Sequence, residues 1–263
     1  MESITVITIT RNRPKLLKRA IASVQKQKCC CTFKHLVLVD DCEKTQRMLK
    51  KNPYTYSNFT WHFMPRLSWE RSGPGRSSRL RNHGVKITDS QWICFLDDDN
   101  EWKENHLQEL IDCLHETGFR AAHSHMIIVN KDGTPFLDRR LPWCRNLEEG
   151  KQMYIELCSQ GVFTPGSCIV KDRADPIDHP NPVRTVDTGE WLLARELLIE
   201  VPFRDDFNAV DEANVTGEDD KLLTDLINKK EPIACSNQPT LIYYLGGYSN
   251  NFDGEYDSSF AWR

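Results

Sequence analysis

Four short apolar runs in the first hundred residues most constrain how this chain can fold. They cover residues 4–9, 36–39, 61–64 and 92–96. After the first run, apolar side chains recur at helical spacing behind Pro14, and proline suits the first turn of a helix. Apolar strands separated by helices are typical of parallel sheets that are covered on both faces. We therefore predict an α/β fold with a mainly parallel central sheet and helices on both of its faces.

The second half of the chain is less regular. Its expected strands cover residues 126–129, 168–170 and 241–245. Leucines and an isoleucine over 222–227 predict a helix, and a stretch rich in proline and aspartate over 173–182 predicts a loop. Because neither an internal repeat nor a linker is visible, we predict a single domain over 1–263. In the first half, residues 1–107, the expected strands and helices alternate regularly, and in the second half, residues 108–263, their order is more variable.

Charge and hydropathy exclude several classes of protein. Lys and Arg number 34 against 38 Asp and Glu, a net charge of −4, whereas binding to a nucleic acid duplex needs a basic surface. No apolar stretch reaches the length of about 18 residues that a membrane-spanning helix requires. The first residues, Met1 to Ile4, lack the basic and apolar regions of a secretory signal, so we expect a cytoplasmic protein.

The chain has ten cysteines. Three are consecutive, Cys29, Cys30 and Cys31, and the other seven are scattered without a CxxC pair. Zinc sites usually take closely spaced pairs of ligands, and a reducing compartment keeps thiols free. We therefore expect free thiols, several of them buried. Whether the triple cysteine is a reactive or a peripheral patch stays open.

Carboxylates follow the second and the fourth expected strand. Asp40 and Asp41 end the second, and Asp97, Asp98 and Asp99 end the fourth. Ligands of open α/β sheets bind at the carboxyl ends of the strands. Three adjacent acids repel one another, and a cation such as Mg²⁺ or Mn²⁺, which takes carboxylates together with phosphate oxygens, would relieve that repulsion. The acidic triad 97–99 thus favours a metal site, although a solvated acidic turn before a helix has the same composition.

Arginines accompany these acids. Arg11 and Arg13 follow the first strand near the start of a helix, a position that favours phosphate. Arg76, Arg79 and Arg81 lie in a glycine- and arginine-rich segment upstream of the acidic triad. The planar guanidinium suits phosphate oxygens, so the set predicts a diphosphate pocket. Neither GxxxxGK[ST] nor GxGxxG occurs, which disfavours a P-loop and a standard dinucleotide fold.

A further acidic motif opens the expected helix of the second half. Gly217, Glu218, Asp219 and Asp220 come just before its leucines. Acids at this position complement the helix dipole. One of them could also act as a general base that deprotonates an acceptor hydroxyl.

Together these features resemble the inverting glycosyltransferases of family 2, which have the GT-A fold, a single Rossmann-like domain. Residues 4–17 resemble that family's opening strand, T-x-N-R turn and helix. Four more segments resemble its motifs: the strand-end Asp-Asp in 38–41, Arg-Asn-x-Gly in 81–84, the DxD-type metal motif in 96–100 and the Glu-Asp acceptor motif in 217–219. The resemblance covers the first 107 residues and, beyond them, only the last motif.

The resemblance implies a donor site in the first half and an acceptor site in the second. Thr10 and Arg13 would lie along the nucleotide. Asp40 or Asp41 would hydrogen-bond the base or the ribose, and Arg81 would face the diphosphate or the sugar.

The resemblance also implies a metal site and a catalytic base. Asp97, Asp98 and Asp99 would hold the nucleotide-sugar, and Asp97 and Asp99 would bind Mn²⁺ or Mg²⁺. Asp219 would be the base, with Glu218 beside it. In the implied reaction the acceptor hydroxyl loses its proton to the base and displaces the nucleoside diphosphate in one inverting step.

The leading hypothesis is therefore a metal-dependent transferase that moves a sugar from a nucleotide-diphospho-sugar to a glycan, lipid-linked glycan or peptide. A UDP-sugar is the favoured donor. A nucleotidyltransferase is one alternative, although that class favours a lysine-bearing, glycine-rich loop where Arg11-Asn12-Arg13 stands. A non-catalytic module that binds nucleotide-sugars is the other, and the intact acidic motifs argue against it.

Overall fold

The computed structural model describes residues 2–51, 57–70, 72–144 and 146–247. Its strands are β1 (Ser3–Thr10), β2 (Thr32–Asp40), β3 (Phe59–Met64), β4 (Trp92–Phe95), β5 (Glu101–Trp102), β6 (Ala121–Val129), β7 (Ile169–Val170), β8 (Trp191–Ala194) and β9 (Ile233–Tyr244). Its helices are α1 (Pro14–Gln25), α2 (Glu43–Lys51), α3 (Pro74–Ile87), α4 (His106–Thr117), α5 (Leu147–Ser159), the short 3₁₀ helix η1 (Thr188–Glu190), α6 (Arg195–Glu200), α7 (Ala209–Asn214) and α8 (Glu218–Asn228). None of the helices in these ranges has both the length and the apolarity needed to cross a membrane.

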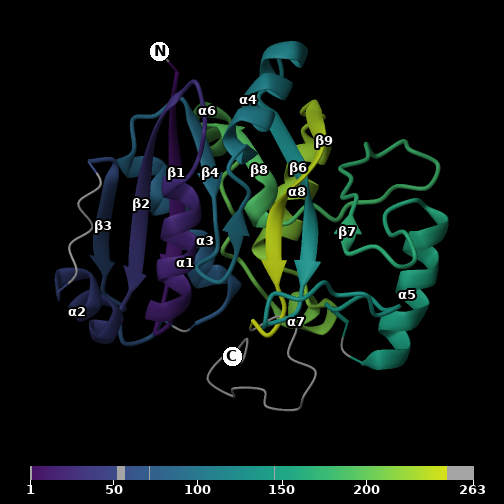
Figure 1. Cartoon of the computed structure of the whole chain (residues 1–263), viewed down its shortest axis with the longest axis horizontal. Coiled ribbons are helices and arrows are strands. Elements are labelled where there is room, and N and C mark those ends of the chain that lie inside the picture. Colours follow the sequence, from purple (N-terminus) through teal and green to yellow (C-terminus); the bar gives the residue numbers. More distant parts are fainter. Residues whose placement is uncertain (1, 52–56, 71, 145, 248–263) are drawn as a thin grey trace.

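The described strands form one sheet in the order β3-β2-β1-β4-β8-β6-β9-β5, with β7 paired to β6 (Figure 1). β1 pairs in parallel with β2 and β4, and β2 pairs in parallel with β3. β8 runs antiparallel between β4 and β6, and β6 and β9 are again parallel. The long ladders are the parallel ones, so the prediction of an α/β fold with a mainly parallel sheet is confirmed.

Alternate residues of β2 show how helices cover both faces of the sheet, because neighbouring side chains of a strand point to opposite faces. Val37 and Val39 belong to a small cluster with apolar side chains of α1 and α2. Leu36 and Leu38 belong to a larger cluster, which also takes in apolar side chains of α3, α4, α6 and α8. The larger cluster draws on both halves of the chain, from β1 to β9.

α3 occupies the segment whose sequence is rich in glycine and arginine. Pro74 begins the helix after Gly73, whose φ of 126° is a conformation that favours glycine. The buried face of α3 carries Arg76 and Arg81 beside the apolar Leu80. The apolar periodicity that predicts helices is therefore missing here, and the helix is not visible in the sequence.

Gly84 sets how closely α3 approaches β1. A Cβ atom at this position would lie 2.9 Å from Cδ1 and 3.1 Å from Cγ2 of Ile7, well inside van der Waals contact. We expect Gly84→Ala to lower the free energy of unfolding by about 1–3 kcal/mol, the usual cost of overpacking a core, as measured by urea unfolding. Combining it with Ile7→Val, which removes Cδ1, should cost less than the sum of the two single changes. Simple additivity in the double variant would contradict this account.

The parallel pairing brings the C-terminal ends of β1, β2 and β4 to one edge of the sheet, the lower edge in Figure 1. Thr10 ends β1, Asp40 ends β2, and the acidic triad follows β4. The residues that the sequence singled out after separate strands therefore lie along a single edge.

Candidate active site

The strand-end acid Asp98 is buried and bound to the turn that follows β1. Thr10 Oγ1 donates a hydrogen bond to Asp98 Oδ2 at 2.6 Å. Arg13 Nε lies 3.4 Å from Asp98 Oδ1, and Arg13 Nη1 donates to Asp99. Burial raises the pKa of Asp98 to about 7, with Arg13 opposing the rise and Asp99 adding to it. Thr10 and Arg13, both predicted to line the donor site, thus contact the acidic triad directly.

Arg81 joins the acidic triad to the acidic motif of the second half. This buried arginine of α3 donates from Nη2 to Asp97 Oδ1 at 2.9 Å and from Nη1 to Glu218 Oε1. Burial alone would lower the pKa of Arg81, but the charges of Glu218 and Asp97 outweigh that effect and raise it. One buried cation therefore holds a carboxylate from a strand end and a carboxylate from a helix start in the same cluster.

Glu218 and Asp219 occupy the first turn of α8. Asp220 Oδ2 caps the helix by accepting from the N–H of Gly217 at 2.6 Å, and Asp219 Oδ1 accepts from the N–H of Asp220 at 3.0 Å. Burial raises the pKa of Asp219 well above its usual range, and the charges of Asp220, Glu218 and Asp187 raise it further. A carboxylate with a raised proton affinity is a stronger base in its ionised form.

Asp187 is an acid of this cluster that the sequence analysis missed. Burial, followed by the charge of Asp97, raises the pKa of Asp187 to about 8, and Asp187 in turn acts on Asp219. Its Oδ1 accepts from the N–H of Gly189 at 2.7 Å, and Glu190 Oε2 accepts from the N–H of Asp187 at 2.8 Å. The Asp-x-x-Glu pattern of this capping box is typical of a helix start, so the turn could have been predicted from the sequence. Nothing in the pattern indicated that the turn lies beside Asp97.

Asp40 is enclosed by arginines. Arg66 Nε and Arg76 Nε each donate to Asp40 Oδ1 at 3.0 Å, and Arg66 Nη2 donates to Oδ2. Arg11 Nη1 reaches the carbonyl oxygen of Asp40 at 3.4 Å. Asp41 is exposed and has a φ of 44°. Of the two acids predicted to meet the base or the ribose, Asp41 is therefore the one whose side chain faces solvent.

The structure separates the three arginines that the sequence grouped into a diphosphate pocket. Arg76 and Arg79 both pair with Glu70, and Arg79 also reaches Asp205. Only Arg81 of the three contacts the acidic triad. The reason is helical geometry, because positions three apart lie on one side of a helix whereas positions five apart are rotated by about 140°.

The acids around Arg81 could supply oxygen ligands to a divalent cation. Four carboxyl groups lie near its single guanidinium: Asp97, Asp187, Glu218 and Asp219. At the other end of the triad, a Cβ atom on Gly247 would lie 2.9 Å from Asp99 Oδ2, so glycine leaves room at that carboxylate. Carboxylates are ligands that Mg²⁺ and Mn²⁺ prefer. Within the described ranges no three of these carboxylates converge within 4.8 Å, so a cation would have to draw them together.

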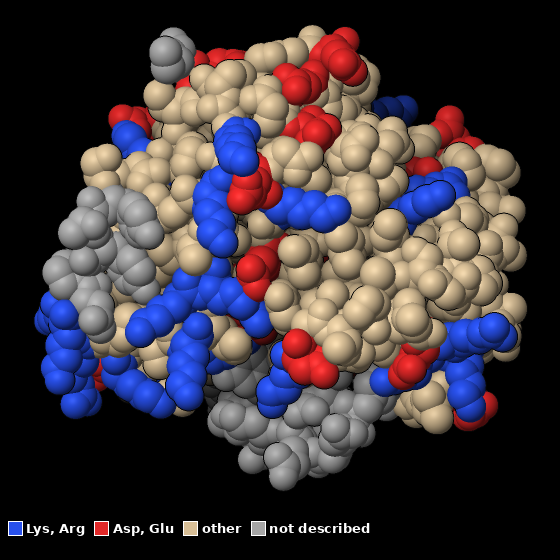
Figure 2. Space-filling model, viewed as in Figure 1, with Lys and Arg blue, Asp and Glu red and all other residues tan. Residues whose placement is uncertain are grey.

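Basic side chains gather beside this edge of the sheet. Figure 2 shows Lys and Arg over α1 and α2, the helices that follow the ends of β1 and β2. The exposed ones are Lys15, Lys18, Lys44, Arg47, Lys50 and Lys51. The net charge of −4 therefore hides a local positive surface, which favours anionic ligands.

Comparison with known proteins decides the family. The model of glycosyl transferase family 2 matches residues 5–175, well over half of the chain. The chain belongs to glycosyl transferase family 2. The resemblance seen in the sequence is thereby confirmed for this family. The match includes Thr10, Arg81 and the acidic triad, whereas Glu218 and Asp219 lie beyond it.

Among curated proteins, this family 2 member is similar to poly(ribitol-phosphate) β-N-acetylglucosaminyltransferase TarP of Staphylococcus aureus strain N315. The two are 24% identical over 182 residues, which cover 68% of this chain and 51% of TarP. The chain thus spans about half the length of this relative.

Among solved structures, the fold is similar to that of S. aureus TarS residues 1–349. The TM-score is 0.59 at 16% identity, over 93% of this chain and 60% of that one. The same TarS fragment in complex with UDP-GlcNAc gives a TM-score of 0.59 at 17% identity, over 95% of this chain and 60% of that one. At this identity the likeness establishes the fold, and the predicted GT-A arrangement is confirmed.

Proposed function

We propose that this family 2 member transfers a sugar from a UDP-sugar to an acceptor hydroxyl, with inversion at the anomeric carbon. The observation that carries the proposal is the Arg81 bridge, which brings Asp97 and the Glu-Asp motif of α8 into one cluster. A donor site and a general base held side by side are what a single displacement requires. The TarS structures with UDP and with UDP-GlcNAc support UDP as the nucleotide of the donor and UDP-GlcNAc as the first donor to test.

In this mechanism Asp219 is the general base. A carboxylate oxygen takes the proton of the acceptor hydroxyl while the hydroxyl oxygen attacks the anomeric carbon, and the bond to the diphosphate breaks on the opposite face. Arg81 keeps Glu218 beside the base. Arg13 and Arg81 place positive charge where the leaving diphosphate gains negative charge, which lowers the barrier.

We also propose that Asp97 and Asp99 hold Mn²⁺ or Mg²⁺ together with the donor. Such a cation, when bound, neutralises charge on the leaving diphosphate. Both carboxylates now pair with arginines, Asp97 with Arg81 and Asp99 with Arg13. If the phosphate oxygens of the donor pair with the arginines while the carboxylates bind the cation, every charged group keeps an oppositely charged partner. This exchange makes the binding of donor and cation mutually dependent.

The acceptor is a hydroxyl of a glycan, a lipid-linked glycan or a peptide. The name of TarP specifies poly(ribitol-phosphate), which is a polyanion. The basic surface over α1 and α2 would attract such a chain. Poly(ribitol-phosphate) is therefore an acceptor to test beside neutral glycans and a hydroxyl-bearing peptide.

Donor binding tests the proposed function. UDP should raise the melting temperature of the protein, and UDP with Mn²⁺ should raise it further, because a ligand that binds only the folded state stabilises it. At 100 times the dissociation constant the gain is about 2.7 kcal/mol. GDP and dTDP are the controls for recognition of the nucleobase, and Mn²⁺ alone is the control for the cation. Asp99→Asn should lose the additional rise in melting temperature that Mn²⁺ causes. No shift with any nucleoside diphosphate, with or without metal, would reject the proposal.

The products of turnover separate the remaining alternatives. Incubation with UDP-GlcNAc should release UDP and yield a β-linked product from the α-linked donor. Release of pyrophosphate from a nucleoside triphosphate and a sugar phosphate would instead identify a nucleotidyltransferase. Tight UDP binding without consumption of any sugar donor, in the presence of each candidate acceptor, would identify a binding module.

A further inference from the structure

The consecutive cysteines Cys29, Cys30 and Cys31 lie at the sheet edge opposite to the candidate active site. They directly precede β2, whose first residue, Thr32, pairs with Ser3 at the start of β1. The acidic triad follows the other end of the same parallel ladder, after β4. The proposed transfer reaction therefore leaves these three side chains without a role.

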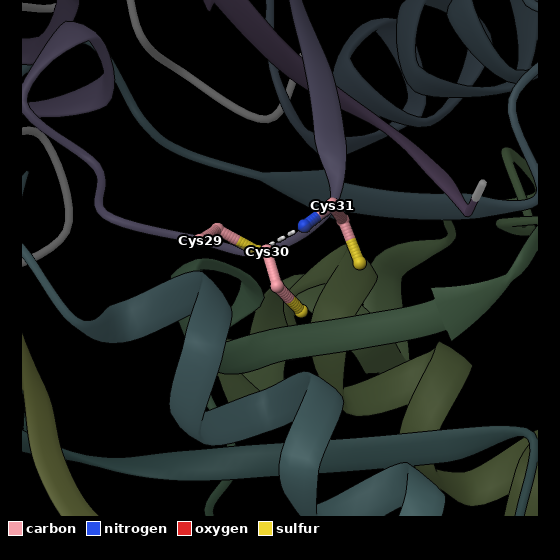
Figure 3. A group of neighbouring side chains, drawn as sticks. All are labelled: Cys29, Cys30 and Cys31. Carbon is pink, nitrogen blue, oxygen red and sulfur yellow. Dashed lines mark hydrogen bonds between the residues drawn. The ribbon is translucent and has the colours of Figure 1, made fainter.

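Their sulfur atoms converge. All three Sγ atoms lie within 4.8 Å of one another, and no other set of three or more His, Cys, Asp or Glu ligand atoms does so in the part of the chain that the structure describes. The backbone N–H of Cys31 donates to Cys29 Sγ at 3.3 Å, which holds the Cys29 side chain against the backbone of Cys31 (Figure 3). Cys31 is buried, Cys29 is half-buried and Cys30 is exposed. The sulfur triangle is thus backed by the core and open to solvent on one side.

The backbone around the cysteines is held from both sides. Lys28 N–H donates to the carbonyl oxygen of Glu104 at 2.7 Å, and Cys30 N–H donates to Gln108 Oε1 of α4 at 2.8 Å. Thr32 N–H donates to the carbonyl oxygen of Glu2 at 3.1 Å. These bonds hold the turn against α4, the residues just before α4 and the segment before β1, so the backbone that carries the three cysteines is fixed by the fold.

We propose that Cys29, Cys30 and Cys31 bind Zn²⁺ through three thiolates, with the fourth position of a tetrahedral site facing solvent. Zn–S bonds of about 2.3 Å place the sulfurs of such a site about 3.8 Å apart, so small side-chain rotations complete the geometry. Binding releases the three thiol protons to solvent, and the cation removes the repulsion among the three thiolates.

Glu2 lies beside this cluster, and His115 lies beside Glu2. Glu2 Oε2 lies 3.7 Å from Cys31 Sγ and 2.7 Å from His115 Nε2. The Cys31 thiol donates this hydrogen bond in the metal-free protein, and loss of the thiol proton on Zn²⁺ binding removes it. The spacing of the cysteines without a CxxC pair argued against zinc in the sequence, but the folded turn brings the three sulfurs together without it.

Titration of the reduced, chelator-treated full chain with Zn²⁺ and Cd²⁺ tests this site. We expect one tightly bound equivalent, with a sulfur-to-cadmium charge-transfer band in the ultraviolet. Cys30→Ser alters an exposed side chain and should fold, yet weaken Zn²⁺ binding at least about 10-fold. Cys168→Ser, at a half-buried cysteine elsewhere, should bind Zn²⁺ as the wild type does. Asp97→Asn with Asp99→Asn should also keep the equivalent, which separates this site from the candidate active site.

Three results would overturn the proposal. One is the same Zn²⁺ affinity in Cys30→Ser as in the wild type, with the two metal-free melting temperatures matched. The second is the absence of the charge-transfer band when Cd²⁺ is added to the reduced wild-type chain. Reaction of all ten thiols with a thiol reagent after denaturation is the control that the cysteines are reduced. The third is loss of the bound equivalent in the double aspartate variant, because carboxylates and not thiolates would then be the ligands.

Discussion

Replacing Asp219 with asparagine should lower the rate of sugar transfer by about 10²–10⁴-fold, the range that general-base catalysis contributes. Asparagine keeps the size and the hydrogen-bond acceptor of the side chain, so the N–H of Asp220 keeps its partner. The amide cannot take the proton of the acceptor hydroxyl. The loss should therefore fall on kcat, measured as UDP released from UDP-GlcNAc in the presence of acceptor, while UDP binding measured by calorimetry stays unchanged.

Asp220→Asn is the matched control for this change. It removes the same charge from the same turn of α8, and its amide oxygen can still accept from the N–H of Gly217 and cap the helix. Its side chain is exposed, so transfer should stay within a few-fold of the wild type. Equal rates in Asp219→Asn and Asp220→Asn would remove Asp219 from the mechanism.

Arg81→Ala should lower the free energy of unfolding by about 3 kcal/mol, because removing one partner of a buried ion pair leaves the other charges uncompensated. Asp97 and Glu218 would then face each other without the cation between them. The figure is at the low end for such pairs, since the side chain of Asp97 is 37% exposed and solvent relieves part of the cost. UDP should also bind more weakly, because the acids that the arginine balanced would repel a diphosphate.

Urea unfolding and UDP calorimetry on two companion variants complete this test. Arg81→Lys keeps the charge but cannot span both carboxylates, so it should lose less stability than the alanine variant. Arg47→Ala breaks an exposed pair with Glu43 on α2 and should cost no more than about 0.5 kcal/mol. Similar losses in Arg81→Ala and Arg47→Ala would show that the bridge does not hold the site together.

The strands of the first half and their acids were predictable because their signals are local. The apolar runs became β1 to β4, and the acids that follow β2 and β4 lie at one edge of the sheet as parallel pairing requires. The acidic motif at 217–219 was likewise placed at the start of a helix, α8. Apolar periodicity and helix-start chemistry act over a few residues, so a single sequence carries them.

Elements that are stabilised by polar or distant partners were not predictable. Neither a helix at α3 or α5 nor a strand at β8 is predicted from the sequence. α3 buries Arg76 and Arg81 against acids from other segments, and β8 is a four-residue strand inserted between β4 and β6. Only the partners, which lie far away in the chain, make these segments stable in those conformations.

The sequence by itself determined the α/β class, the family and the identity of most acids at the site, because those follow from hydrophobic pattern and motif order. Only the tertiary structure decided which charges meet. In the fold, Asp40 accepts hydrogen bonds from Arg66 and Arg76, and Arg81 links Asp97 to Glu218. Asp187 lies close enough to Asp97 for their charges to interact, and three cysteine sulfurs converge. Electrostatic and metal-ligand contacts depend on distances of a few ångströms between residues far apart in the chain, and those distances exist only in the folded protein.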